Sequence, residues 1–246
     1  MGKARGGAFL CKAIRFRVNP RVNTPHSSTQ RLHVAITGNI GAGKTTLAQR
    51  LADEFGWQIF HEAVEGNPYL SDFYGDMQRW SFHLQIYFLR SRYEQVLQIN
   101  DIRQAIIQDR TIYEDAHIFA RNLYQTGLMS ERDYENYVGL FSLMISLVKP
   151  PDLMIYLRAD IPKLQAQIKR RGREFEQNIS AEYLTNLNEL YEEFTLNYRE
   201  SPLLTIDIND LDFAHYEADW QTVLQTIVAA LPGEWQQKSP LNNGPS

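Results

Sequence analysis

The sequence predicts an α/β protein with a five-stranded parallel sheet and helices on both of its faces. Five short apolar runs have the pattern of buried strands, and a helical pattern separates each run from the next. Strands that alternate with helices in this way form parallel sheets. The expected strands are 32–37, 58–61, 105–108, 153–157 and 203–208, and the expected helices are 44–55, 80–102, 113–124, 131–148, 161–170, 181–198 and 216–230.

The first strand and the first helix flank a glycine-rich loop. The strand 32–37 is apolar, and apolar side chains continue at helical spacing through the helix 44–55. Residues 38–45 fit the pattern G-x-x-x-x-G-K-(S/T). In such a loop the backbone N–H groups cradle phosphates, the lysine neutralises the outer phosphates, and the hydroxyl holds Mg²⁺. We therefore expect a P-loop that binds a nucleoside triphosphate.

Charged side chains follow the second and third strands. Glu62 comes directly after the strand 58–61, and Asp109 and Arg110 follow the strand 105–108. Ligands of open parallel sheets bind beyond the carboxyl ends of the strands, so these side chains should face the P-loop. Glu62 can take a proton from an attacking hydroxyl, Arg110 can stabilise charge on a transferred phosphoryl group, and Asp109 can order Mg²⁺ through water. Each residue alone could form a surface ion pair, but their joint placement predicts a phosphoryl-transfer site.

Two helices carry more apolar side chains than one sheet face needs. The helix 80–102 is rich in aromatic and aliphatic residues, and the helix 131–148 becomes strongly apolar before Pro150 and Pro151 end it. A thick monomeric core could use these side chains. We favour the alternative, a homodimer formed through the long helices.

Charge is unevenly placed along the chain. Residues 1–31 contain seven basic residues and no acidic one, whereas residues 32–246 contain 18 basic and 29 acidic residues, a formal charge of −11. An acidic folded part argues against nucleic acid as the partner. The basic cluster within 169–176 is therefore interpreted as a mobile lid over a triphosphate, in preference to a nucleic-acid patch.

The ends of the chain differ from the domain expected at 32–231. The Arg-rich segment 1–31 has features of a transit peptide, but we favour a disordered basic leader or an early start codon. The segment 232–246 is expected to be a disordered tail, because Pro, Gly, Asn and Ser dominate it. Cys11 is the single cysteine, and no apolar run approaches about 18 residues. These features predict a cytoplasmic protein without membrane contact.

Several longer segments resemble the deoxynucleoside kinase family. They run in the same order as in the family, from Leu32 to about Asp212, and look most like bacterial deoxyadenosine kinases. The resemblance implies a P-loop nucleoside-kinase fold with a short lid, ATP as phosphoryl donor and Mg²⁺ as cofactor. The matching segments are GNIGAGKTT (38–46), EAVEGNPYL (62–70), FYGDMQRWSFHLQIYFL (73–89), DRTIYEDAHIFA (109–120), KRRGREFE (169–176) and SPLLTIDIND (201–210).

The resemblance also implies catalytic roles. Glu62 matches the general base that deprotonates the sugar 5′-hydroxyl, with Ala63 at a position where many relatives have proline. Arg110 matches the arginine beside the 5′-hydroxyl, and Arg171 and Arg173 match lid arginines that close over the triphosphate. The residues expected to be catalytic are Glu62, Lys44, Arg110, Arg171 and Arg173.

Ligand contacts follow from the same resemblance. Thr45 and Asp109 are expected at the metal, and Gln167 stands where some relatives have an arginine that stacks on the donor base. Tyr74 and Glu176 match the pair that holds the sugar 3′-hydroxyl. The residues expected to bind ATP are Gly38, Asn39, Ile40, Gly41, Ala42, Gly43, Lys44, Thr45, Thr46, Arg171, Arg173, Asp212 and Phe213.

The expected base pocket favours a base with an exocyclic amine. Gln85 and Arg92 lie seven residues apart on one face of a helix, and Phe119 lies one turn after Asp115. In the family these four positions match the residues that contact the base. The Asp115 carboxylate can accept a hydrogen bond from adenine N6 or cytosine N4, whereas thymine O4 would place acceptor against acceptor. Guanine is harder to exclude, because Arg92 could donate to its O6. A plain Arg92–Asp115 ion pair is the alternative interpretation.

The sequence therefore predicts transfer of the γ-phosphoryl group of ATP to the 5′-hydroxyl of a deoxynucleoside, deoxyadenosine first and deoxycytidine second, in deoxynucleotide salvage. The enzyme alternatives are a deoxyguanosine kinase and a nucleoside-monophosphate kinase. The second of these would need no carboxylate base, so Glu62 argues against it. The non-enzyme alternative is an inactive structural relative, which would have lost Lys44, Glu62, Arg110 or the lid arginines. All of these residues are present.

Overall fold

The structure is a computed structural model that describes residues 31–62, 66–173, 176 and 179–237. The expected leader therefore lies outside the described residues apart from Arg31, and so does the end of the expected tail, 238–246.

Five parallel strands form one sheet, in the order β2-β3-β1-β4-β5. The five strands predicted from the sequence are confirmed, each within one residue of its expected ends. Ile36 of β1 pairs with Asp109 of β3, and Gly38 pairs with Leu157 of β4, so the P-loop begins beside Asp109. The strands are β1 (Leu32–Gly38), β2 (Gln58–Phe60), β3 (Ala105–Asp109), β4 (Leu153–Arg158) and β5 (Leu203–Asp207).

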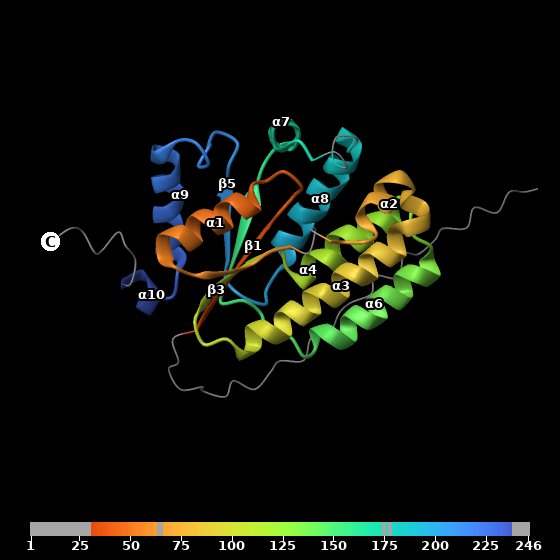
Figure 1. Ribbon diagram of the computed structural model, residues 1–246, viewed down its shortest axis with the longest axis horizontal. Coiled ribbons are helices and arrows are strands. Elements are labelled where there is room, and N and C mark those ends of the chain that lie inside the picture. Colours follow the sequence, from red (N-terminus) through yellow and green to blue (C-terminus); the bar gives the residue numbers. More distant parts are fainter. Residues whose placement is uncertain (1–30, 63–65, 174–175, 177–178, 238–246) are drawn as a thin grey trace, which may run out of the picture.

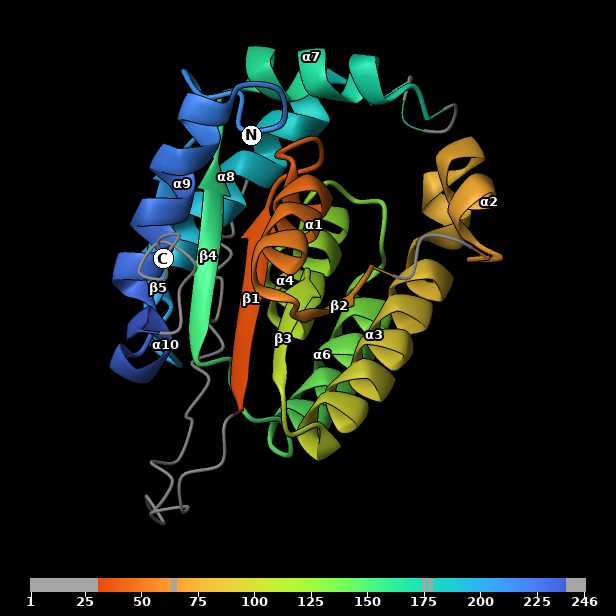
Figure 2. The same ribbon diagram turned by 60° about the vertical axis from the view of Figure 1, so that its left-hand side comes forward.

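Helices cover both faces of the sheet, as predicted (Figures 1 and 2). The helices α1 (Lys44–Phe55) and α9 (Glu217–Ala230) lie over one face, and α8 (Ala181–Asn197) lies over the other. Outside this layer, α6 (Glu131–Ile145) packs along α3 (Met77–Asp101). α7 (Ile161–Arg171) lies across the carboxyl-end edge of the sheet, above the tips of β1 and β4 in Figure 2. None of the described helices has both the length and the apolar character that a membrane span requires.

Two features near the site differ from the expected helices. The helix expected at 113–124 is divided into α4 (Ile112–Glu114), a π-helix η1 (Asp115–Ala120) and α5 (Arg121–Gln125). A short helix α2 (Leu70–Gly75), which carries Tyr74, precedes α3 and was not predicted. π-helical turns inside α-helices commonly mark functional sites. Both differences therefore occur in segments that reach the carboxyl-end edge of the sheet.

The start of the expected tail is wrong. Helix α10 (Gly233–Gln237) lies within the segment expected to be disordered. Trp235 is buried there, and its ring packs edge-on against Trp57 with centroids 6.1 Å apart. The ordered fold therefore extends to Gln237, because one aromatic side chain anchors an otherwise polar segment to the core.

Candidate active site

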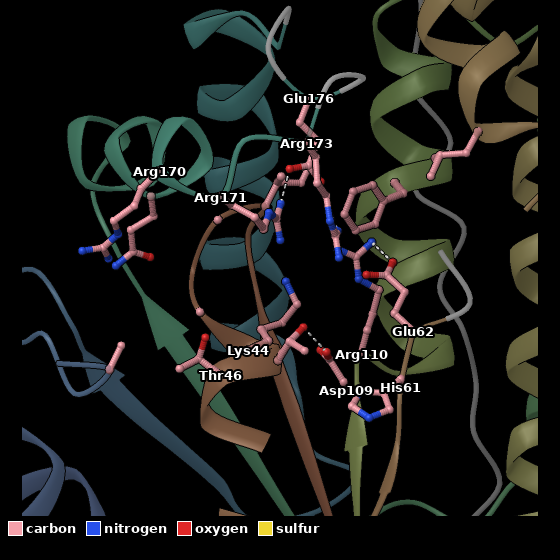
Figure 3. Close-up of a pocket in the computed structure, with 18 of the residues that line it drawn as sticks. Lys44, Thr46, His61, Glu62, Asp109, Arg110, Arg170, Arg171, Arg173 and Glu176 are labelled. Carbon is pink, nitrogen blue, oxygen red and sulfur yellow. Dashed lines mark hydrogen bonds and ion pairs between the residues drawn. The ribbon is translucent and has the colours of Figure 1, made fainter. Parts of the chain in front are cut away.

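A cavity of about 940 Å³ opens at the carboxyl ends of β1 and β3, between the P-loop, α2, α3 and α7 (Figure 3). It brings together side chains that are far apart in the sequence, as expected for an open parallel sheet. Most of the expected site residues line it. Those are Ile40, Gly41, Gly43, Lys44, Thr45, Thr46, Glu62, Tyr74, Gln85, Asp109, Arg110, Asp115, Phe119, Arg171, Arg173, Glu176, Asp212 and Phe213.

The P-loop is shaped by contact with α7. Gly41 has a φ of +85°, and a Cβ atom there would lie 2.8 Å from both the Leu164 carbonyl oxygen and Ile168 Cγ1. Only glycine satisfies this backbone conformation and this contact together. The loop and the helix that leads into the lid therefore touch without a side chain between them.

Lys44 is buried at the base of the loop. Its Nζ donates hydrogen bonds to the carbonyl oxygens of Gly38 and Asn39, at 2.8 and 3.0 Å. Burial and, after it, the neighbouring Arg110 lower the pKa of Lys44 to about 8, against the nearby carboxylates. The ammonium group is thus desolvated beside another cation, so an anion bound in the loop would stabilise its charge.

Three of the expected ATP-binding positions, Gly38, Asn39 and Ala42, do not line the cavity. The Asn39 side chain turns away from it and donates to Leu184 O and Asn188 Oδ1 of α8, at 3.0 and 2.8 Å. Asn39 thereby fixes the P-loop to α8, and only its backbone remains available to a phosphate.

The expected metal residues are in contact. Thr45 Oγ1 donates to Asp109 Oδ2 at 2.5 Å, and the buried Asp109 Oδ1 has no hydrogen-bond partner among the described residues. These hard oxygen atoms suit Mg²⁺, which is usually bound by one or two protein oxygens together with phosphate oxygens and water. No group of three or more His, Cys, Asp or Glu side chains able to hold a metal occurs in the described chain.

Glu62 and Arg110 form a buried ion pair beside the P-loop (Figure 3). Glu62 Oε1 lies 2.9 Å from Arg110 Nη1, and the guanidinium stands over the Phe119 ring, 4.2 Å from its centroid. Burial opposes ionisation of Glu62, but Arg110 and then Lys44 outweigh it, so the pKa of Glu62 lies below its ordinary value. Glu62 is therefore ionised at neutral pH.

Arg110 also has an unusual backbone. Its φ of +72° is the one positive φ of a non-glycine residue in the described ranges. That conformation costs a residue with a Cβ atom about 1–2 kcal/mol. It bends the chain at the end of β3, so that the guanidinium returns over the cavity.

The lid places two of its three arginines on Glu176. Arg171 Nη2 is hydrogen-bonded to Glu176 Oε2, and Arg173 Nη1 lies 3.4 Å from Glu176 Oε1. Glu176 is 6% exposed in its side chain, while both arginines are about one-third exposed (34% and 35%). Arg170 points away from this group (Figure 3) and pairs with Asp212 at 3.3 Å. One buried carboxylate thus holds both expected triphosphate clamps.

Several buried polar atoms in the cavity wall and behind it lack hydrogen-bond partners among the described residues. Gln85 Oε1, Asp115 Oδ2 and Arg92 Nη2 have no hydrogen-bond partner among the described residues. Arg92 Nε lies 3.6 Å from Asp115 Oδ2, and both side chains are almost fully buried. Arg92 stands behind Asp115 and does not itself line the cavity. Burial raises the pKa of Asp115 to about 6, against the pull of Arg92 and Arg110. Unpaired buried polar atoms of this kind call for a polar ligand.

Tyr74 lines the cavity from α2. Burial raises the pKa of its hydroxyl above the ordinary value, with Tyr183 and Glu176 adding to the effect. Tyr74 and Glu176 are thus close enough to interact electrostatically, as expected for two groups that share a ligand.

Comparison with known proteins decides the family. Residues 34–231 match the family described as "Deoxynucleoside kinase". The chain belongs to this deoxynucleoside kinase family. It is therefore an ATP-dependent phosphotransferase that acts on deoxynucleosides.

Relatives of this kinase differ in the base they accept. The chain is 36% identical over 200 residues to a deoxyadenosine/deoxycytidine kinase of Bacillus subtilis (80% of this chain, 92% of the relative). It is 34% identical over 194 residues to a deoxyguanosine kinase of the same organism (77% and 93%). A solved structure of deoxyadenosine kinase from M. mycoides with bound dATP superposes with a TM-score of 0.71 at 34% identity, covering 80% of this chain and 98% of that chain.

The cavity of this kinase also contains residues that the sequence did not single out. Leu84 and Phe88 flank Gln85 and supply apolar walls, and helical spacing on α3 could have identified them. Tyr183 lines the cavity from the first turn of α8, and no local motif marks it. Gln167, which the sequence did single out at the donor-base position, also lines the cavity, and its Oε1 has no hydrogen-bond partner in the described chain.

Proposed function

We propose that this kinase transfers the γ-phosphoryl group of ATP to the 5′-hydroxyl of deoxyadenosine, with deoxycytidine as a second substrate. The observation that carries the proposal is the pair of buried acceptor atoms, Gln85 Oε1 and Asp115 Oδ2, neither of which has a hydrogen-bond partner in the described chain, although Asp115 Oδ2 lies 3.6 Å from Arg92 Nε. Gln85 and Asp115 line the same cavity as Lys44, Glu62 and Arg110.

The charges around the cavity suit an in-line phosphoryl transfer. The 5′-hydroxyl would give its proton to Glu62, while Arg110 stabilises the charge on the transferred group. Lys44, Arg171 and Arg173 would hold the triphosphate, and Thr45 with Asp109 would hold Mg²⁺, which would neutralise phosphate charge. Positioning and electrostatics supply such catalysis, and no covalent intermediate is required.

Base choice would follow from the Asp115 carboxylate. An amine at adenine N6 or cytosine N4 can donate to it, whereas thymine O4 would face it acceptor to acceptor. A buried mismatch of this kind discriminates by about 10⁴-fold where the pocket is built around the hydrogen bond. Tyr74 and Glu176 would hold the sugar 3′-hydroxyl.

Deoxyguanosine is the second candidate, favoured by one observation. Arg92 Nη2 is a buried donor without a hydrogen-bond partner in the described chain, and it would bind guanine O6 if the Asp115 side chain, which stands between Arg92 and the cavity, moved aside. The 34% identity to a deoxyguanosine kinase of Bacillus subtilis also supports this alternative. A nucleoside-monophosphate kinase is disfavoured, because Glu62 would repel an acceptor phosphate.

Steady-state kinetics with the four deoxynucleosides, ATP and Mg²⁺ test the proposal. The value of kcat/KM should be highest for deoxyadenosine, lower for deoxycytidine and lowest for thymidine. A preference for thymidine would contradict the role of Asp115. A preference for deoxyguanosine would assign base choice to Arg92.

We further propose that the enzyme is a homodimer joined through α3 and α6. Leu97 on α3 and Leu140, Leu143 and Leu147 on or just after α6 are 42–71% exposed, an unusual grouping for solvent-facing leucines. Figure 1 shows these two helices side by side at the edge of the molecule. Leu143→Glu should give monomers in analytical ultracentrifugation, whereas Leu196→Glu, at an equally exposed leucine of α8, should not.

A further inference from the structure

The end of β3 contains a buried polar network that the proposed chemistry does not use. Glu114 and Tyr191 are both fully buried, and neither lines the cavity. Glu114 Oε1 accepts a hydrogen bond from the Tyr191 hydroxyl at 2.9 Å. Glu114 Oε2 accepts from the Thr111 backbone N–H at 2.8 Å, and Thr111 in turn caps the short helix that Glu114 ends.

This network adjoins the strained backbone of Arg110. The Arg110 N–H donates to Ile36 O at 3.0 Å, and the next peptide N–H is the one bound by Glu114. A non-glycine residue with a φ of +72° keeps that conformation only where its surroundings hold it. Two hydrogen bonds, one on either side of the Arg110 α-carbon, restrain this conformation. One joins the Arg110 N–H to Ile36 O of β1, and the other joins the Thr111 N–H to Glu114.

Tyr191 also touches the other support of the Arg110 side chain. Its ring meets Phe119 edge-on, with centroids 6.5 Å apart, and Phe119 is the ring under the Arg110 guanidinium. The Tyr191 ring also stacks on the Tyr156 ring, with centroids 5.9 Å apart. Tyr191 therefore contacts two aromatic rings, and its hydroxyl donates to Glu114 from outside the turn.

We propose that Glu114 and Tyr191 are positioning residues that hold Arg110 in its left-handed conformation and so keep its guanidinium beside Glu62. The inference rests on the proposed role of Arg110 in phosphoryl transfer. Glu114 acts through the Thr111 N–H, and Tyr191 acts through Glu114. Neither residue touches a substrate.

A double-mutant cycle tests this coupling. Tyr191→Phe removes one hydroxyl and keeps the ring, and Glu114→Gln keeps the volume but removes the charge. Each should lower kcat by about tenfold, the usual effect of one hydrogen bond to a charged group, with KM for ATP and for deoxyadenosine changed less than about twofold. In an Arg110→Lys background the same two changes should add almost nothing, because the group they position is gone.

The control is Tyr198→Phe, which removes another buried tyrosine hydroxyl, bonded to Ser201 Oγ at 2.8 Å. It should leave kcat unchanged, and thermal unfolding of every variant shows whether the fold is kept. Losses that multiply with the Arg110→Lys loss, or an unchanged kcat in Tyr191→Phe and Glu114→Gln, overturn the positioning role alone. A normal kcat in Arg110→Lys itself overturns the proposed role of Arg110, and the positioning role with it.

Discussion

Replacing Glu62 by glutamine tests the assignment of the general base. The two side chains have the same shape, and the amide oxygen can still accept a hydrogen bond from Arg110 Nη1, now 2.9 Å from Glu62 Oε1. Glutamine can also accept a hydrogen bond from a 5′-hydroxyl, but it cannot take the proton. The change therefore removes proton transfer and leaves binding largely intact.

The size of the loss follows from the environment of Glu62. General-base catalysis contributes about 10²–10⁴-fold, and the contribution is smaller when the base is weak. Arg110 and Lys44 hold the pKa of Glu62 below its ordinary value despite burial, so it is a weak base. We therefore expect the lower half of the range, a loss in kcat of about 10²–10³-fold, or about 3–4 kcal/mol in the barrier.

The assay is ADP production at saturating ATP, deoxyadenosine and Mg²⁺, with KM measured for both substrates. The matched control is Glu193→Gln, which removes a carboxylate paired with Arg121 at 2.9 Å outside the cavity. The control should keep full activity. A Glu62→Gln enzyme that folds normally and keeps kcat within about threefold of the wild type would refute proton transfer to this residue.

Three further predictions concern the cavity. The value of kcat/KM for deoxyadenosine should fall below pH about 6, because Asp115 is then protonated and is no longer a pure hydrogen-bond acceptor. It should also fall above pH about 8, because Lys44 then loses its proton. A pH profile of kcat/KM measures both effects. Gly41→Ala should raise KM for ATP and lower Tm, since its Cβ atom would meet α7 at 2.8 Å, whereas Gly139→Ala, which meets nothing within 4 Å, should do neither. Because the Glu176 carboxylate contacts both lid arginines, we expect deoxyadenosine and a non-hydrolysable ATP analogue to increase each other's affinity. Glu176→Gln should weaken this increase, which calorimetry measures.

The parts of the fold set by periodic patterns were predictable from the sequence. All five strands are confirmed, because short runs of β-branched and aliphatic residues are typical of parallel strands that are buried on both faces. The helix α1 is confirmed at both ends, since a P-loop starts it and Gly56 ends it with a left-handed φ of +71°. Glu62, Asp109 and Arg110 also gather at one edge of the sheet as expected, because strand direction alone decides where they lie.

The parts that escaped prediction depend on contacts between distant segments. The π-helix at 115–120 replaces a regular helix, and no single-residue signal distinguishes the two. The positive φ of Arg110 adjoins a hydrogen bond to Ile36 O and, through Glu114, one from Tyr191 of α8, and both of these partners are remote in sequence. Trp235 anchors a polar segment through Trp57, so composition alone misjudged the tail.

The charges of the site are also balanced by side chains from segments that are distant in the sequence. Lys44, Arg110, Arg171 and Arg173 surround the cavity, and each ion pair among them uses a carboxylate that the proposal also assigns to a substrate. Glu62 pairs with Arg110 and would accept the proton of the sugar 5′-hydroxyl. Glu176 pairs with the lid arginines and would accept a hydrogen bond from the sugar 3′-hydroxyl. On the proposed function, a triphosphate would compete with these carboxylates for the arginines, and the released carboxylates would accept hydrogen bonds from the sugar. Donor and acceptor binding would thereby be linked through shared charges, and the linkage would need no movement of the sheet.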